Sequence, residues 1–97
     1  MESTIAVAAL GALAHETRLQ VFRLLVRAGS GGMAVGRIAE ALGVEANGRL
    51  SFHLKELVAA GLAASRQEGR FVYYSTDYAA MSELLRYLTE DCCGGLG

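Results

Sequence analysis

The apolar residues between positions 5 and 61 recur every three or four residues, which is the spacing of helices that bury one face. This spacing predicts four helices, at Ile5–Ala14, Thr17–Ala28, Val35–Leu42 and Arg49–Ala60. A glycine follows each of the last three, and glycine is a common helix stop. The third and fourth helices, joined by a short turn-like stretch, are typical of a helix-turn-helix.

The spacing changes after Gly61. Leu62–Arg66 and Arg70–Ser75 are rich in small, β-branched and aromatic residues, with Glu68 and Gly69 between them. Two such runs separated by a glycine-containing turn predict a β-hairpin.

Helical spacing returns from Asp77 to about Asp91, where apolar residues lie three, four and three positions apart. This spacing makes a narrow seam suited to another helix. We therefore predict one domain, residues 1–97, with a mainly α fold and a β-hairpin (α+β). Its parts are a helix-turn-helix at about 34–61, the hairpin at about 62–76 and a last helix at about 77–93.

Composition narrows the class of protein. A chain with 53% apolar and 20% charged residues is not intrinsically disordered. No apolar run approaches 18 residues, and the N-terminus lacks the pattern of a signal peptide, so we expect a cytoplasmic protein that does not span a membrane. A chain of 97 residues buries only about 60–65% of its unfolded surface, which favours a dimer.

The net charge of −1 is the sum of two unlike regions. Residues 14–75 carry eight basic and five acidic side chains, a net charge of +3, whereas the two ends carry one basic and five acidic, a net charge of −4. The predicted helix-turn-helix thus lies in the basic part of the chain, as nucleic-acid binding requires.

On a helical wheel of Arg49–Ala60, Phe52 lies opposite the apolar stripe. Either this face enters the major groove of DNA, or Phe52 packs under the hairpin and its polar neighbours are merely solvated; the wheel favours neither. His53 lies nearer the stripe, so a structural hydrogen bond rivals a DNA contact for it. The residues that we predict to contact DNA, with two hairpin arginines for phosphates or the minor groove, are Asn47, Arg49, Ser51, Phe52, His53, Lys55, Arg66 and Arg70.

These residues carry a family resemblance. The run Ser51-Phe52-His53-Leu54-Lys55-Glu56-Leu57, then Ala60-Gly61-Leu62, Arg66-x-x-Gly69-Arg70 and Tyr73-Tyr74, resembles the ArsR/SmtB family of winged-helix repressors. His15-Glu16-Thr17-Arg18-Leu19 is similar to the opening of that family's second helix, and the likeness covers about residues 10–93. One departure is the stretch from Val44 to Leu50, a residue longer than the family's usual turn.

The resemblance implies a winged helix-turn-helix homodimer that binds operator double-stranded DNA and leaves it when an inducer binds. It also implies a dimer interface made by the first and last helices. The seam of the last helix agrees with this independently. The interface residues that we expect are Val7, Leu10, Tyr78, Met81, Leu85 and Leu88.

Two adjacent cysteines, Cys92 and Cys93, are the candidate sensing site. Because the side chains of neighbouring cysteines diverge in ordinary backbone geometry, we expect two thiols rather than a disulfide. Thiolates select soft, thiophilic ions. The sulfur atoms of consecutive helical residues point about 100° apart and converge only where the helix end unwinds.

Other metal sites of the family are missing from the sequence. A Cys-x-Cys site would fall at Ala34-Val35-Gly36, and a zinc site starting at Asp77 has no histidine on the last helix. The cysteine pair instead resembles the arsenic-responsive branch, which implies trivalent arsenic or antimony, As(III) or Sb(III), as inducer, inorganic or as an organoarsenical, and no organic cofactor.

Other functions remain open at this stage. The cysteines can form a thiol-based redox or reactive-sulfur sensor, although Glu90 and Asp91 beside them disfavour a free thiolate, or they can be unliganded thiols. The fold can also serve as a protein-interaction module that does not bind DNA. We do not expect an enzyme, because the sequence has no glycine-rich phosphate loop, no paired carboxylates and no evident catalytic partner for its histidines.

Overall fold

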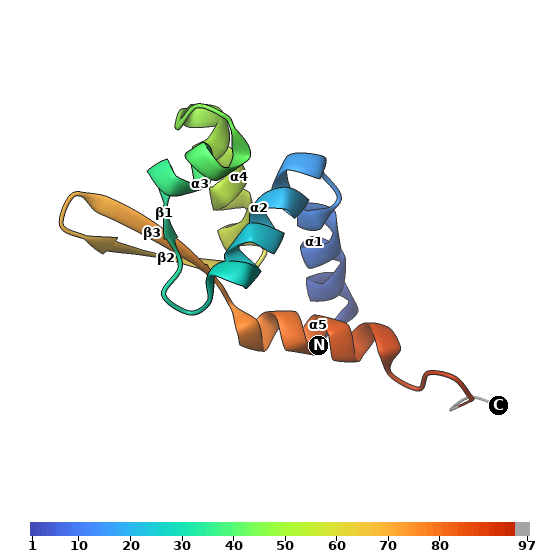
Figure 1. Cartoon of the computed structure of the whole chain (residues 1–97). Coiled ribbons are helices and arrows are strands. Elements are labelled where there is room, and N and C mark those ends of the chain that lie inside the picture. Colours follow the sequence, from blue (N-terminus) through green and yellow to red (C-terminus); the bar gives the residue numbers. More distant parts are fainter. Residues whose placement is uncertain (95–97) are drawn as a thin grey trace.

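The computed structural model describes residues 1–94 (Figure 1). Its elements are α1 (Ser3–Leu13), α2 (Glu16–Ala28), β1 (Met33–Ala34), α3 (Val35–Leu42), α4 (Gly48–Ala59), β2 (Ala63–Glu68), β3 (Phe71–Thr76) and α5 (Tyr78–Thr89). The predicted winged helix-turn-helix is confirmed, with one addition: the two-residue strand β1, which is too short to leave a pattern in the sequence. No helix of residues 1–94 is long and apolar enough to cross a membrane.

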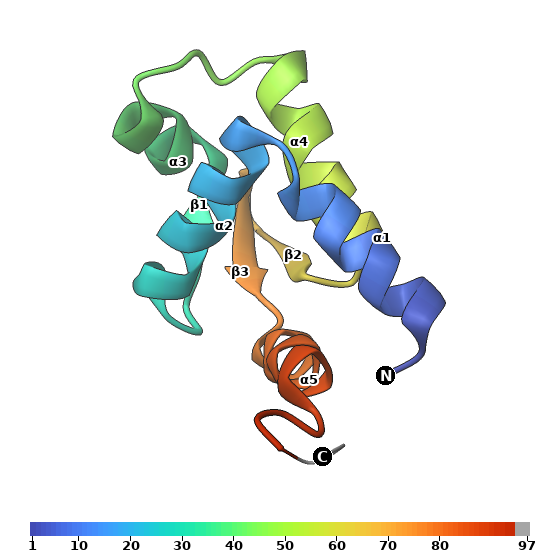
Figure 2. The same ribbon diagram turned by 90° about the vertical axis from the view of Figure 1, so that its right-hand side faces the viewer.

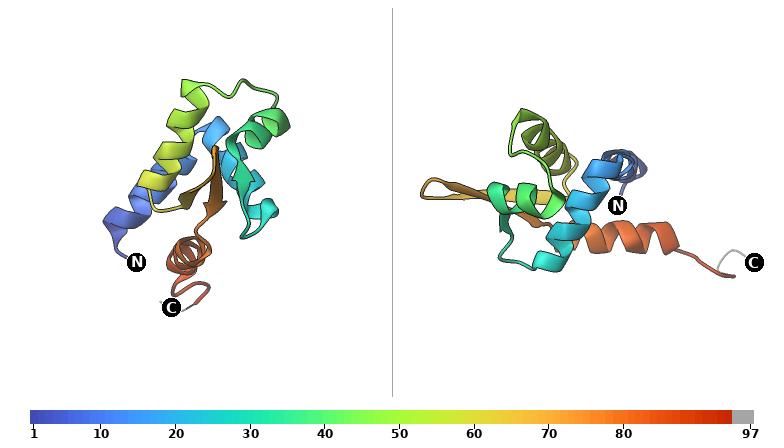
Figure 3. Two further views of the ribbon diagram at one scale, coloured as in Figure 1. Left: turned by 90° about the vertical axis from the view of Figure 1, so that its left-hand side faces the viewer. Right: turned by 45° about the horizontal axis from the view of Figure 1, so that its top comes forward.

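Helix α2 is the centre of the core. It packs against α1, α3, α4 and β3, and it buries Val21, Phe22 and Leu25. Helix α4 buries the apolar stripe that the wheel predicted, and it lies beside α1 in two views (Figures 2 and 3). Burying such a face stabilises a helix more than its intrinsic propensity does.

Side-chain caps fix where the helices begin. The Asn47 carboxamide oxygen accepts from the backbone N–H groups of Arg49 and Leu50, at 3.1 and 3.3 Å, and so starts α4. Asp77 starts α5 in the same way, accepting from the N–H of Ala80 at 3.0 Å. Such caps satisfy amide groups that a helix leaves without partners.

The antiparallel sheet has the strand order β1-β3-β2. The β2–β3 hairpin, which we call the wing, projects from one end of the molecule, away from α1 and α5 (Figure 1). Strand β2 is one residue longer than predicted, β3 has the predicted length but begins one residue later, and the two loop residues are Gly69 and Arg70 rather than Glu68 and Gly69. Gly69 has φ +63°, which a glycine at the first loop position adopts without strain.

Helix α5 is anchored to the body at its start. The backbone N–H of Asp77 donates to the carbonyl of Leu62 at 2.9 Å, and the Tyr78 hydroxyl donates to the carbonyl of Val26 at 3.1 Å. Leu84 is the buried residue of α5. The helix ends at Thr89, before the predicted end at Asp91, because Glu90 has an extended ψ of 133° and Asp91 has φ +60°, so neither continues it.

The connection between α2 and β1 passes close to the backbone of β3 at Gly32. Gly32 has φ +74°, and a Cβ built on it would collide with the backbone carbonyl oxygen of Tyr74. Gly32→Ala should therefore lower the free energy of unfolding by at least about 2 kcal/mol in urea denaturation. Gly31→Ala is the matched control: a Cβ there meets nothing within 4 Å, so it should stay within about 0.5 kcal/mol of wild type. Equal effects of the two substitutions would contradict the close approach.

Candidate functional site

The outer face of α4 displays the side chains predicted to contact DNA. Arg49 and Lys55 are exposed, and Phe52 is 55% exposed. Phe52 therefore does not pack under the hairpin. Ser51 is half-buried at the edge of this face. Asn47 lies at the start of α4, where its side-chain oxygen caps the helix.

His53 is placed differently from the prediction. It is buried at 7% exposure, because it lies on the apolar side of α4. Its Nδ1 accepts a hydrogen bond from Nη1 of Arg18 at 3.2 Å, and its ring lies 4.5 Å from that of His15, centroid to centroid. Listing His53 among the DNA contacts was therefore wrong, and the structural hydrogen bond weighed against it is what the structure shows.

Arg18 connects three helices through this bond. From the first turn of α2, its Nε donates to the carbonyl of Ala12 in α1 at 2.7 Å while its Nη1 reaches His53 in α4. Sequence reasoning noted Arg18 as part of a family motif but assigned it no role. No periodicity could reveal the role, since Arg18 and His53 are 35 positions apart.

This environment lowers the pKa of His53 below its ordinary value of 6.5. Burial is the largest cause, and the positive charge of His15, Arg18 and Arg49 adds to it, while Glu56 opposes it. Protonation would also remove the lone pair on Nδ1 that accepts from Arg18. At neutral pH the folded protein therefore favours the neutral form of His53.

The wing arginines differ in their surroundings. The Arg66 guanidinium forms an ion pair with Glu68 and lies 4.8 Å from the centre of the Tyr73 ring. Arg70, in the loop of the wing, is exposed. The charge of Arg66 is thus partly offset on the wing itself, which the sequence pattern did not indicate.

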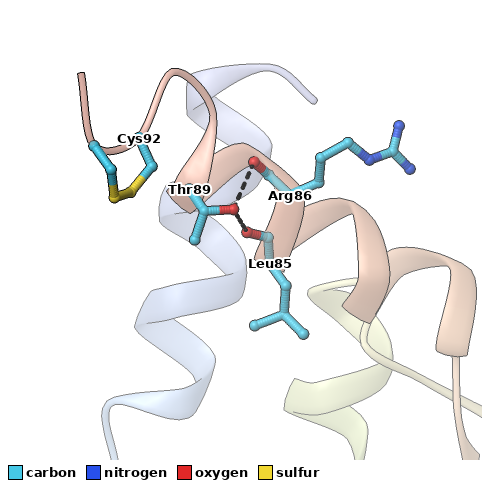
Figure 4. The surroundings of a disulfide bond; sticks show 5 residues. Leu85, Arg86, Thr89 and Cys92 are labelled. Atoms are coloured by element: carbon cyan, nitrogen blue, oxygen red, sulfur yellow. Dashed lines mark hydrogen bonds between the residues drawn. A yellow bond between two sulfur atoms is a disulfide. The ribbon is translucent and has the colours of Figure 1, made fainter. Parts of the chain in front are cut away.

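The two cysteines follow α5, whose end lies at the opposite end of the molecule from the wing (Figure 1). They are joined by a disulfide, so the expectation of two thiols was wrong for this state (Figure 4). The backbone explains the difference, because Cys93 has φ +67°, which is not ordinary helical geometry. The chain has already left the helix at Thr89, whose hydroxyl donates to the carbonyl of Leu85 at 2.9 Å.

Both cysteines are exposed, and the N–H of Cys92 donates to the carbonyl of Thr89 at 3.0 Å. Within residues 1–94, no group of three or more histidine, cysteine or acidic side chains is placed to hold a metal ion. The chain itself therefore offers a soft ion two sulfur ligands at this place.

The remaining predicted residues lie on α1 and α5, which pack against each other. Val7 and Leu10 on α1 and Leu85 and Leu88 on α5 are exposed by 40–65%. Tyr78 and Met81 are half-buried instead, and Met81 packs against the core of its own chain. The seam read from the sequence is thus divided between the inner and the outer face of α5.

The lowered pKa of His53 predicts a pH-dependent stability. Between pH 6.5 and the lower folded pKa, the unfolded chain binds more protons than the folded one, so stability should fall as the pH falls through this window. Urea denaturation at about pH 7.5 and about pH 5.5 measures the loss. His53→Gln should reduce the difference between the two pH values, whereas His15→Asn, at an exposed position, should keep most of it. An unchanged difference in His53→Gln would refute the assignment.

The chain was compared with known families and proteins. A helix-turn-helix domain family matches residues 13–66, which is more than half of the chain. The nodulation protein NolR of Rhizobium meliloti is 33% identical over 89 residues, covering 92% of this chain and 70% of that protein.

Two solved structures share the fold. HlyU from Vibrio cholerae is 34% identical with a TM-score of 0.70, covers 91% of this chain and 97% of its own, and is also known in a reduced form. The homodimeric winged helix-turn-helix DNA-binding domain of Mb0332 from Mycobacterium bovis, a possible ArsR-family regulator, is 31% identical with a TM-score of 0.69, covering 91% and 81%. With the exposed face of α4 and the projecting wing, these matches show that the chain belongs to the ArsR family of winged-helix, DNA-binding transcriptional regulators.

Proposed function

We propose that the chain is a homodimeric repressor that binds operator DNA and releases it when As(III) or Sb(III) binds Cys92 and Cys93. The observation that carries this proposal is the pair of sulfur atoms held side by side at the exposed end of α5. The backbone there has already left the helix, which is the condition for adjacent sulfurs to converge.

The reduced form of the pair has the chemistry for a trivalent metalloid. Two thiols replace two hydroxides of arsenous acid, so two As–S bonds form and two water molecules leave. Arsenic keeps the oxidation state +3, and the third hydroxide remains. A monosubstituted organoarsenical has two exchangeable ligands, so two sulfurs satisfy it fully. Binding displaces the thiol protons, so no lowered thiol pKa is needed.

The proposed dimer uses the exposed apolar side chains of α1 and α5. Val7, Leu10, Leu85 and Leu88 lie on two helices that pack against each other, so they can form one surface for a second copy. A small chain gains most from burying such side chains, at about 1.5–3 kcal/mol for each one fully buried. Tyr78 and Met81, which are half-buried, would pack between this surface and the core of their own chain.

Binding at Cys92 and Cys93 would act on DNA through α5. The anchors at Asp77 and Tyr78 connect this helix to Leu62, directly before the wing, and to α2. A shift of α5 at the dimer interface would change the distance between the two recognition helices, which must match half-sites about 34–36 Å apart. A coupling of about 1–3 kcal/mol would lower operator affinity about 5- to 150-fold.

A second candidate has a specific observation in its favour. Cys92 and Cys93 form a disulfide, the product that a thiol-based redox sensor would contain. Two thiols would reduce a peroxide to two water molecules and form the S–S bond, and a thiol reductant would restore them. The structural relative HlyU is known in a reduced form, which is compatible with this alternative.

The two candidates are distinguished by which reagent releases the operator, and fluorescence anisotropy of labelled operator DNA measures this release. The protein is first reduced with a phosphine, which does not compete as a thiol, and is then titrated with arsenite or with phenylarsine oxide. For the titration with diamide the phosphine is removed beforehand, because diamide oxidises it and because it would reduce the disulfide again. Wild type should release DNA with both arsenicals, at a lower concentration for phenylarsine oxide. The Cys92→Ser/Cys93→Ser double variant should not respond, whereas Ser82→Ala, at an exposed position of α5, should respond like wild type.

Release of the double serine variant by arsenite would overturn the metalloid site. Release of wild type by diamide but not by arsenicals would instead establish the redox candidate. The single variants Cys92→Ser and Cys93→Ser test whether both sulfurs are required.

The wing arginines give a further prediction on operator binding. Arg70→Ala should weaken binding similarly for all DNA sequences and make the dependence on salt less steep, because it removes a phosphate contact. Arg66→Ala should have a smaller effect, because Glu68 already offsets its charge. Titrations at several salt concentrations measure both. A larger effect at Arg66 than at Arg70 would contradict the roles assigned to them.

A further inference from the structure

Phe71 is the first residue of β3, directly after the loop of the wing, and it is 56% exposed. An isolated exposed apolar residue is common on proteins and needs no explanation. Phe71 differs because it is a large aromatic side chain at the tip of an element that projects from the body (Figure 1).

The register of the wing explains why this chain does not cover Phe71. Residues paired across an antiparallel ladder share one face, and the face alternates along each strand. Ala63, Tyr74 and Thr76 lie on the inner face and are buried in the core. Phe71, paired with Glu68, lies on the outer face.

On the same outer face, Arg66 contacts two other side chains of the wing. Arg66 is paired across the strands with Tyr73, lies over its ring and forms an ion pair with Glu68. These contacts offset the charge of Arg66 and stiffen the wing. At the tip they leave one exposed cation, Arg70, next to one exposed aromatic ring, Phe71.

We propose that Phe71 is an apolar wedge that enters the minor groove of operator DNA beside each half-site, with Arg70 on the neighbouring phosphates. Proteins that read the minor groove insert apolar side chains of this kind between base steps and partly unstack them. Flexible pyrimidine–purine steps are deformed most easily, so Phe71 would give the wing a sequence preference without a hydrogen bond to a base.

The charge of the wing favours DNA over a protein as the partner of Phe71. Arg70 is adjacent to it, and the one acidic side chain of the tip, Glu68, is paired with Arg66. The wing also lies away from α1 and α5, the helices proposed for dimerisation (Figure 1). The inference rests on DNA binding by the winged-helix body and not on what Cys92 and Cys93 bind.

The test compares Phe71→Ala and Phe71→Leu with wild type, without any inducer. The probe is a duplex of about 30 base pairs that wild type selects from a random library, long enough for two half-sites one turn apart. Leu19→Ala is the matched control, since Leu19 is an exposed apolar residue on α2. Thermal unfolding of each variant checks that the fold is retained, as expected for an exposed site.

Phe71→Ala should lower affinity for this duplex about tenfold or more with the salt dependence unchanged, because the lost contact is not ionic. Phe71→Leu should retain most of the affinity, and Leu19→Ala all of it. With 2-aminopurine replacing single adenines beside the half-sites, wild type should raise its fluorescence through unstacking, and Phe71→Ala should not.

Three results would overturn the proposal. The first is an affinity of Phe71→Ala within twofold of wild type. The second is a less steep salt dependence in that variant, which would mean a lost phosphate contact. The third is loss of the dimer in sedimentation, which would make Phe71 a protein contact instead.

Discussion

The position of the recognition helix depends on one half-buried cation. Arg18 extends from α2 and donates both to the carbonyl of Ala12 in α1 and to the ring of His53 in α4. A guanidinium taken partly out of water needs such partners, and hydrogen bonds from a charged donor contribute about 1.5–3 kcal/mol each. The neutral state of His53 is part of the same arrangement, because a second positive charge at this place would repel the first. The hydrogen bonds of Arg18 and the neutral state of His53 therefore fix the orientation of α4 together.

With its inner side held in this way, α4 has one face left for another molecule. Arg49, Phe52 and Lys55 lie on that face, and the wing carries the exposed Phe71 and Arg70 at its tip. The basic excess of residues 14–75 belongs to these surfaces, whereas the acidic excess belongs to the two ends of the chain. The near-neutral total charge is therefore the sum of a basic region, suited to a polyanion, and of two acidic chain ends.

Periodicity was enough to predict the order of the helices and the hairpin, because each long element buries an apolar stripe of its own. It failed where the structure depends on contacts between distant residues. The strand β1 has two residues and exists through its pairing with β3. Leu84 was not predicted to be buried, because the seam on α5 drew attention to Leu85 and Leu88 beside it. His53 was listed as a DNA contact with a structural hydrogen bond as the rival, but its partner Arg18 could not be identified from the sequence. The convergence of the cysteines depends on backbone angles that no spacing encodes.

The distance between the two ends of the molecule constrains how an inducer can act. The wing and the end of α5 lie at opposite ends of a molecule whose longest extent is 53 Å, so the inducer proposed for Cys92 and Cys93 would not contact DNA bound at the wing. The anchors at Asp77 and Tyr78 hold the start of α5 to the body, whereas Leu85 and Leu88 on its outer side are more than half exposed among the described residues. Under the proposed function, a change at the cysteines would therefore act mainly where a second copy packs against α5. Since two half-sites fix the distance between two recognition helices, a small rotation of one copy against the other is enough to weaken both contacts at once.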